Sequence, residues 1–323
     1  MSRRELIDPE VRPPLEELLR TTPGGFNAIA DLGERRATLE RLLAGADTPA
    51  DPRVTIEDRT VPGPAGEPGI RVRVYRPAGA DGELPGIYYV HSGGMIMGSV
   101  EAEDGAATML CAAVQAVVVS VEYRLAPEFP YPAGVEDCYA GLAWVGDHTR
   151  ELGIDPHRLA VFGMSSGGGL AVATALLARD RRGPRLAFLM PIYPMLDDRN
   201  ATESSYEICD IGIWDRSANV EAWAWYLNGK PADQYAAPAR AVDVKGLPPT
   251  FMDVGTVDLF RDEDIDFAQR LMGAGVPLEM HIHSGAYHAA EVFAPESALA
   301  HRIWSLRIDA LKRALAVTPR RDA

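Results

Sequence analysis

The sequence has few cysteines and no long apolar run, and both shortages exclude classes of protein. Its three cysteines, Cys111, Cys138 and Cys209, are scattered and form no C-x-x-C spacing. Neither a disulfide framework nor a zinc site is therefore expected, and a reducing compartment fits. No apolar run approaches the roughly 18 residues that a membrane span requires. The N-terminal arginines are followed by acidic residues and prolines rather than by an apolar segment, so no signal peptide is expected. The sequence predicts a cytoplasmic protein.

Positive charge is also in short supply. The chain has 32 Lys and Arg residues against 46 Asp and Glu residues, which gives a net charge of −14. This balance argues against nucleic acid and anionic membranes as partners. Hydrophobic residues make up 47% and charged residues 24% of the chain, as in ordinary globular proteins, so disorder is not expected. A length of 323 residues suits one large α/β domain with an inserted or appended cap.

Short apolar runs alternate with helix-compatible stretches over most of the chain. Apolar runs typical of strands buried on both faces occupy residues 87–90, 116–121, 159–162, 186–192, 250–254 and 278–282. Helix-compatible stretches between them occupy residues 101–114, 134–149, 168–181 and 262–273. Ahead of these, alternating apolar residues at 70–74 predict a half-exposed strand paired with 54–61. The pattern predicts an α/β fold with a mostly parallel central sheet covered by helices on both faces.

Two segments fall outside this alternation and predict a helical cap. Residues 1–50 have helix-like apolar spacing and no strand signal, and the gap of about sixty residues after 192 is too long for a plain crossover. We therefore expect a catalytic core at 51–194 and 246–318, with an N-terminal cap segment at 1–50 and a cap insertion at 195–245. The alternative is a helical insertion that packs on the side of the domain for stability alone. We favour the cap, because loops at the carboxyl ends of parallel strands usually form the site.

A candidate nucleophile lies where an apolar strand leads directly into a helical run. Residues 163–167 read Gly-Met-Ser-Ser-Gly, the G-x-S-x-G pattern in a strand–turn–helix context. The glycines avoid clashes around a tight turn that exposes the serine, and the helix N-terminus favours developing negative charge. Ser166 would need a glycine at position 164, which is methionine. Ser165 is therefore the predicted nucleophile, and the alternative is a glycine-rich turn without chemistry.

A second glycine-rich loop follows the run at 87–90. It reads His91-Ser92-Gly93-Gly94 and is similar to the HGGG-type loops that supply backbone N–H groups to an oxyanion hole. A tetrahedral intermediate needs two or three such donors about 3 Å from its oxygen. We predict that the N–H groups of Gly93, Gly94 and Ser166 form the oxyanion hole and that His91 anchors the loop. Ser92 stands where glycine is expected, so either its φ tolerates a side chain or the hole is perturbed.

The base and the acid are predicted from chain order. This type of fold requires Ser…Asp…His, and His288 follows the last predicted strand in an expected loop at 284–288. Asp258 comes shortly after the run at 250–254, at its carboxyl end, and is the best-placed acid. The alternatives are Asp253, which lies inside a strand, and the acidic residues at 262–266, which begin a helix where capping explains them.

A metal site is the other use considered for histidine. His281 and His283 alternate on one strand face, but no carboxylate or cysteine is found at ligand spacing. We therefore predict no metal.

Together these motifs resemble the hormone-sensitive-lipase-like (bacterial family IV) esterases. The resemblance rests on residues 91–94, 98–99, 123–128, 132–137, 163–168, 258–263 and 285–288. It implies an α/β-hydrolase fold, hydrolysis of carboxylic esters with a preference for short acyl chains, a helical cap and frequent homodimers. The sequence departs from the family pattern at Ser92, Met164 and Ser166.

The sequence thus predicts a serine carboxylesterase that acts on small-molecule esters through Ser165, His288 and Asp258 without a cofactor. One alternative is an amidase, or a hydrolase of an acylated small molecule, with the same triad. A remote alternative is a small-molecule receptor that has lost catalysis, but the presence of His288 argues against it. Met95, Met97 and Met164 suggest an adaptable acyl pocket, although ordinary core packing would also explain them.

Overall fold

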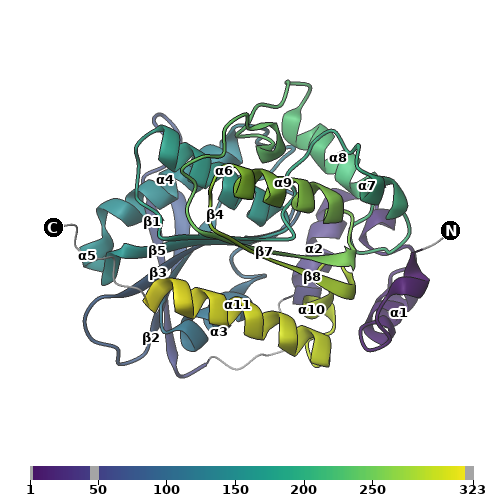
Figure 1. Cartoon of the computed structure of the whole chain (residues 1–323), viewed down its shortest axis with the longest axis horizontal. Coiled ribbons are helices and arrows are strands. Elements are labelled where there is room, and N and C mark those ends of the chain that lie inside the picture. Colours follow the sequence, from purple (N-terminus) through teal and green to yellow (C-terminus); the bar gives the residue numbers. More distant parts are fainter. Residues whose placement is uncertain (1–2, 44–50, 317–323) are drawn as a thin grey trace.

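A single twisted sheet forms the centre of the molecule. The computed structural model describes residues 3–43 and 51–316. Eight strands follow the order β1-β2-β4-β3-β5-β6-β7-β8 (Figure 1). β2 is antiparallel to both of its neighbours, β1 and β4, and all other pairs are parallel. The bounds are β1 Val54–Val61, β2 Ile70–Pro77, β3 Leu84–Val90, β4 Val117–Glu122, β5 Ile154–Met164, β6 Phe188–Ile192, β7 Thr250–Val257 and β8 Leu278–Tyr287.

Each predicted apolar run coincides with a strand of this sheet, because parallel strands covered on both faces need continuous hydrophobic sequence. Two runs begin early, since residue 116 precedes β4 and residues 186–187 precede β6. The predicted pairing of 54–61 with the strand at 70–77 is also present. One expectation is wrong at its boundary. Residues 284–287, expected to be a loop, belong to β8, since Tyr287 pairs with Val257 of β7 after a register shift. His288 therefore follows the strand directly.

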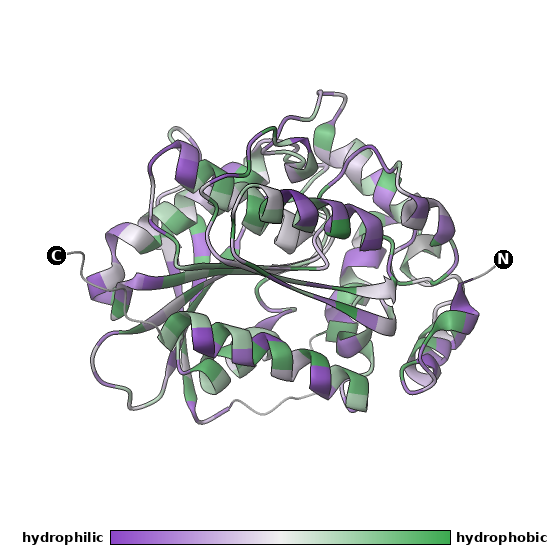
Figure 2. Cartoon of the chain, viewed as in Figure 1, coloured by the Kyte–Doolittle hydropathy of each residue, from purple (hydrophilic) through white to green (hydrophobic). Residues whose placement is uncertain are grey.

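Helices cover both faces of the sheet. Figure 1 shows α3 and α11 on one face and α4, α6 and α9 on the other. Their bounds are α3 Asp104–Val114, α4 Ala133–Asp147, α5 Thr149–Leu152, α6 Ser166–Asp180, α9 Arg261–Gly273, α10 Ala290–Phe293 and α11 Ala298–Ala316. Figure 2 shows hydrophilic and hydrophobic residues together on α9 and α11, as expected for helices with one face toward the core and one toward water. The α/β architecture predicted from the sequence is confirmed.

The two predicted cap segments are helical and contact each other at one end of the sheet. They contain α1 Arg12–Thr21 and α2 Leu32–Leu43, then α7 Glu203–Glu207 and α8 Arg216–Leu227, with short 3-10 turns at Arg4–Leu6, Phe26–Ala28 and Pro238–Arg240. The Phe26 N–H donates to the Gly212 carbonyl at 2.9 Å, and Arg35 pairs with Glu221 at 2.6 Å. Residues 1–2, 44–50 and 317–318 of the predicted segments lie outside the described residues.

The second half of the insertion has a different neighbour. Arg179 of α6 donates to the carbonyls of Asp243 and Lys245, and Arg270 of α9 donates to the carbonyl of Ala239. Residues 239–245 therefore pack against core helices rather than against the N-terminal segment. Within the described part of the chain, no helix is both long enough and apolar enough to cross a bilayer.

Candidate active site

The turn after β5 holds Ser165 in a strained conformation. Its φ is 56° and its ψ is −122°, a region that residues with side chains rarely adopt. A Cβ on Gly163 would lie 2.2 Å from the Gly167 carbonyl oxygen, and a Cβ on Gly167 would lie 2.2 Å from the Val90 carbonyl oxygen. Both glycines of the G-x-S-x-G pattern are therefore required by backbone contact across the turn, as the sequence suggests.

Three side chains distant in sequence form one hydrogen-bonded chain. His288 Nε2 lies 2.9 Å from Ser165 Oγ, and His288 Nδ1 lies 2.9 Å from Asp258 Oδ2. Asp258 directly follows β7 and His288 directly follows β8. Both residues therefore lie at the carboxyl ends of adjacent parallel strands. All three residues are buried. This geometry lets the imidazole accept a proton from the serine while the carboxylate accepts the Nδ1–H.

Aromatic rings hold the imidazole from two sides. Tyr193 and Phe260 meet His288 edge-on, with ring centroids 4.8 and 5.2 Å away. The Tyr193 hydroxyl donates to Glu291 Oε1 at 2.6 Å, and Glu291 in turn pairs with Arg307 at 2.6 Å. Neither Tyr193 nor Arg307 was predicted from the sequence, because no local motif surrounds them.

Arg307 also binds Asp253, the residue considered above as an alternative acid for the triad. Its guanidinium donates to both carboxylate oxygens of Asp253, at 2.7 and 2.9 Å, in the core behind the site. Burial alone would raise the pKa of Asp253, but the Arg307 charge and the hydrogen bonds from His283 and Arg307 together outweigh burial and lower it. Asp253 is therefore the partner of a buried arginine and does not contact His288.

The loop after β3 has the backbone that its glycines suggest. Gly93 and Gly94 have φ of 117° and 65°, and a Cβ on Gly94 would lie 2.2 Å from the Trp214 ring. Both line the cavity that contains Ser165 and His288, and Ser166 begins α6 beside them. Among the described residues, none accepts a hydrogen bond from the N–H groups of Gly93, Gly94 or Ser166. Free donors beside a nucleophile are what an oxyanion hole requires.

Ser92 lies in this loop without a left-handed backbone, so its side chain is tolerated. Its N–H donates to Glu103 Oε1 at 2.8 Å and its hydroxyl donates to the same oxygen. The buried His91 ring stacks on Tyr123 with centroids 4.1 Å apart, and its Nδ1 lies 2.8 Å from the Ser92 carbonyl oxygen. Burial lowers the pKa of His91, so the ring remains neutral and suits an anchoring role.

A mostly apolar cavity of about 160 Å³ lies beside Ser165. Core residues, the N-terminal segment and the insertion all contribute to its wall, the last two through Phe26 and Trp214. Met97 and Met164 line the cavity, whereas Met95 is buried elsewhere and does not. Two of the three methionines therefore line the cavity beside Ser165.

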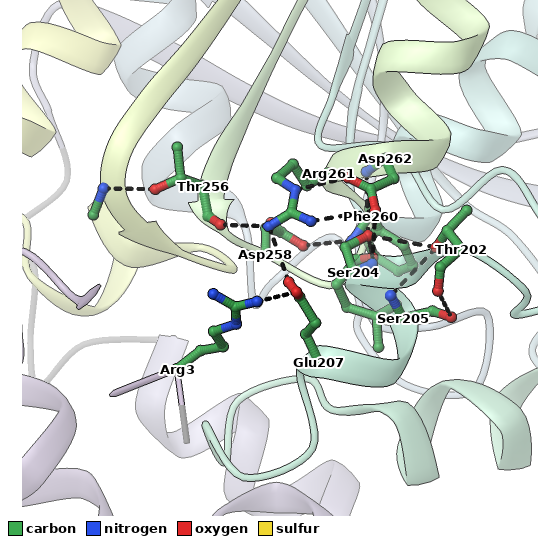
Figure 3. A network of polar contacts seen from close by, with 12 residues as sticks. Arg3, Thr202, Ser204, Ser205, Glu207, Thr256, Asp258, Phe260, Arg261 and Asp262 are labelled. Atoms are coloured by element: carbon green, nitrogen blue, oxygen red, sulfur yellow. Dashed lines mark hydrogen bonds and ion pairs between the residues drawn. The ribbon is translucent and has the colours of Figure 1, made fainter. Parts of the chain in front are cut away.

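A polar network connects the segment that carries Asp258 to the insertion and the N-terminus (Figure 3). Arg261 donates to the Thr256 carbonyl and to Glu207, both at 3.2 Å, and Glu207 also pairs with Arg3. Ser204 donates its N–H to Asp262 at 2.7 Å. These contacts connect the segment that carries Asp258 to the insertion, through Ser204 and Glu207, and from Glu207 to the N-terminal segment, through Arg3.

Helix capping was expected to explain the acidic run at 262–266. That interpretation is wrong for Glu263 and Asp264, which are buried. Glu263 is buried and accepts the N–H groups of Leu196 and Asp197 at 2.7 and 3.1 Å. Burial raises its pKa well above the usual range. Asp264 is fully buried as well.

The two histidines considered as metal ligands have separate carboxylate neighbours. His281 Nε2 lies 2.8 Å from Glu279 Oε1, and His283 Nε2 lies 3.5 Å from Asp253 Oδ2. Each histidine thus has one carboxylate neighbour, and the two neighbours are different residues. Across residues 3–43 and 51–316, no group of three or more His, Cys, Asp or Glu side chains is placed to hold a metal ion.

Comparison with known proteins agrees with this geometry. The sequence pattern of the α/β-hydrolase fold family matches residues 87–292. The chain belongs to this family. It is 38% identical to Carboxylesterase NlhH of Mycobacterium tuberculosis, over 98% of this chain and 99% of that protein. It is 35% identical to Esterase LipI of the same organism, over 93% and 95% of the two chains.

Solved structures give the same result. The structure described as Bacterial Heroin Esterase superposes with a TM-score of 0.91 at 36% identity, covering 97% of this chain and 99% of the other. The resemblance to the hormone-sensitive-lipase-like esterases inferred from the motifs is confirmed.

Proposed function

We propose that the chain is a serine carboxylesterase acting on esters of small molecules, with Ser165 as nucleophile, His288 as base and Asp258 as the acid that orients the base. The observation that carries the proposal is the buried Ser165–His288–Asp258 chain of 2.9 Å contacts, which opens into an apolar cavity. The names of the relatives, carboxylesterase and esterase, agree with it.

The reaction proceeds by two acyl transfers. His288 takes the Ser165 proton as Oγ attacks the ester carbonyl, and the N–H groups of Gly93, Gly94 and Ser166 stabilise the oxyanion. The imidazolium then protonates the departing alcohol, leaving an acyl-enzyme. Water, deprotonated by His288, attacks the acyl group, and collapse of the second intermediate returns the proton to Ser165. Asp258 keeps Nδ1 protonated throughout.

The proposed cap has a direct role in this site. Residues 1–50 and 195–245 would close the cavity, which is supported by Phe26, Leu39 and Trp214 in its wall. A cavity of about 160 Å³ favours short acyl chains over long ones. A cytoplasmic location and a homodimer, both expected at the outset, are part of the same proposal; the three free cysteines agree with the location.

The test is hydrolysis of p-nitrophenyl butyrate by Ser165→Ala. We expect less than about 1% of wild-type kcat/KM, because no other group can form the acyl-enzyme. Ser217→Ala, the same change at an exposed position of α8, serves as control. A fluorophosphonate should label Ser165 in the wild type, which separates an enzyme from a receptor. Substantial activity in Ser165→Ala would overturn the nucleophile, and a faster p-nitroanilide reaction would favour the amidase.

A further inference from the structure

One charged side chain interrupts the apolar wall of the cavity. Glu103, just before α3, is 6% exposed and lines the cavity together with Ser92 and Ser165. Among the described lining residues it is the only Asp, Glu, Lys or Arg. A small number of polar groups in a largely apolar pocket usually determines which ligand binds and in which orientation.

Every hydrogen bond that Glu103 accepts comes from a neutral donor. Oε1 accepts the Ser92 N–H and hydroxyl, and Oε2 accepts the Tyr89 hydroxyl at 2.6 Å. The two carboxyl oxygens are thus contacted by three donors, none of which carries a positive charge. No described Lys, Arg or His forms an ion pair with Glu103, and Arg71 and Arg73 of β2 pair with its sequence neighbours Glu101 and Asp104 instead. Its negative charge is therefore held in place but not neutralised.

A buried carboxylate without a cationic partner is unusual, because buried carboxylates are normally paired with cations. Holding the loop at Ser92 requires only an acceptor, which a neutral side chain also provides. A negative charge beside the oxyanion loop moreover opposes the negative charge that develops during attack on a neutral ester. The charge becomes favourable when the substrate itself supplies a cation.

We propose that Glu103 makes this site selective for esters that carry a positive charge, such as a substituted ammonium group, near the reacting carbonyl. The proposal rests on the esterase function proposed above and names its substrate class. The cationic group would lie in the cavity against the Glu103 carboxylate, and carboxylate-bearing esters would be rejected by the same charge.

The test uses pairs of esters with the same shape and different charge. Acetylcholine and 3,3-dimethylbutyl acetate differ by nitrogen for carbon on the alcohol side. The p-nitrophenyl esters of 4-(trimethylammonio)butanoic acid and 5,5-dimethylhexanoic acid differ in the same way on the acyl side. We expect the wild type to prefer the cation by about ten-fold or more in kcat/KM in at least one pair, the ratio given by one modest charge interaction.

Two variants test whether the charge of Glu103 causes the preference for the cationic ester. Glu103→Gln keeps the size of the side chain and should bring the preferred pair to a ratio near one, mainly by slowing the cation. Ser92→Ala removes the hydroxyl donor and keeps the charge, so the ratio should persist even where all rates fall. Thermal melting of both variants reports whether they fold.

The outcomes separate this proposal from the esterase function. Hydrolysis of the neutral esters with ratios near one in both wild-type pairs overturns the proposal and leaves the esterase intact, whether or not the variants fold. An equal loss on all substrates in folded Glu103→Gln, with the ratio unchanged, shows that Glu103 only holds the loop. If no ester is hydrolysed and a fluorophosphonate does not label Ser165, the esterase function itself fails.

Discussion

Asp264 offers a direct test of how burial controls stability in this fold. Its side chain lies in α9 with 0% exposure, and neither carboxyl oxygen has a hydrogen-bond partner within the described part of the chain. Burial raises its pKa well above the usual range, and the nearby charges of Glu263, Asp258 and Asp253 act in the same direction. The folded protein therefore keeps this carboxyl protonated at a pH where the unfolded chain ionises it.

The consequence is a loss of stability as pH rises. Below the ordinary Asp pKa of about 3.9, both states bind the proton and the carboxyl has no pH-dependent effect. Above it, the unfolded state releases a proton that the folded state retains, so unfolding becomes more favourable. The loss is about 1.4 kcal/mol for each pH unit for as long as the folded carboxyl stays protonated. Between pH 5 and pH 7 the loss has an upper bound of about 2.7 kcal/mol, which applies when the folded carboxyl is still protonated at pH 7.

Asp264→Asn removes the ionisation and keeps the shape. We expect the difference in free energy of unfolding between this variant and the wild type to grow in the variant's favour from pH 5 to pH 7. The corresponding change in Tm is at most about 5 °C for a chain of this size. Urea unfolding or thermal melting at several pH values measures the gap. Asp266→Asn, the same change at an exposed position of α9, should show a nearly constant gap. A flat difference for Asp264→Asn would refute the reasoning.

Two other changes test the site and its support. Gly167→Ala places a Cβ 2.2 Å from the Val90 carbonyl oxygen and so displaces the serine turn. It should lower kcat/KM by at least about 100-fold. The control is Gly273→Ala, whose Cβ meets nothing within 4 Å and which should keep full activity. Arg307→Met leaves two buried carboxylates without their cation and should lower the free energy of unfolding in urea by about 3–5 kcal/mol. A loss below about 1 kcal/mol would mean that these carboxyls become protonated at little cost.

Much of the core was predictable because its signals are local. Parallel strands covered on both faces need uninterrupted apolar sequence, so residues 116–121 and 250–254 identify their strands without tertiary information. The serine turn was equally legible, since Gly163 and Gly167 are required by contacts within a few residues of Ser165 or with the adjacent strand. Asp258 and His288 followed from chain order and from their positions after strands.

Other features had no local signal. Ser92 and Glu103 lie eleven positions apart and meet only because the loop after β3 folds back on the start of α3. The small residues at 284–286 suggest a loop, yet β8 continues through them because β7 lies alongside. The helix α11 was not predicted, although it does have a local signal. Its apolar residues at 299, 303, 311 and 315 have the spacing of one face of a helix.

The α/β architecture, the strained serine and its expected partners were predictable from the amino-acid order alone, because they depend on hydrophobic period, glycine sterics and the order of motifs along the chain. Which charged side chains are exposed and which are buried depends instead on how distant parts of the chain pack together. The acidic run containing Glu263 and Asp264 has the composition of a solvated helix start, but the packing of α9 removes both from water. Likewise, Glu103 became a candidate for specificity only when the cavity wall was assembled around it, since burial and pairing depend on neighbours that the chain brings from a distance.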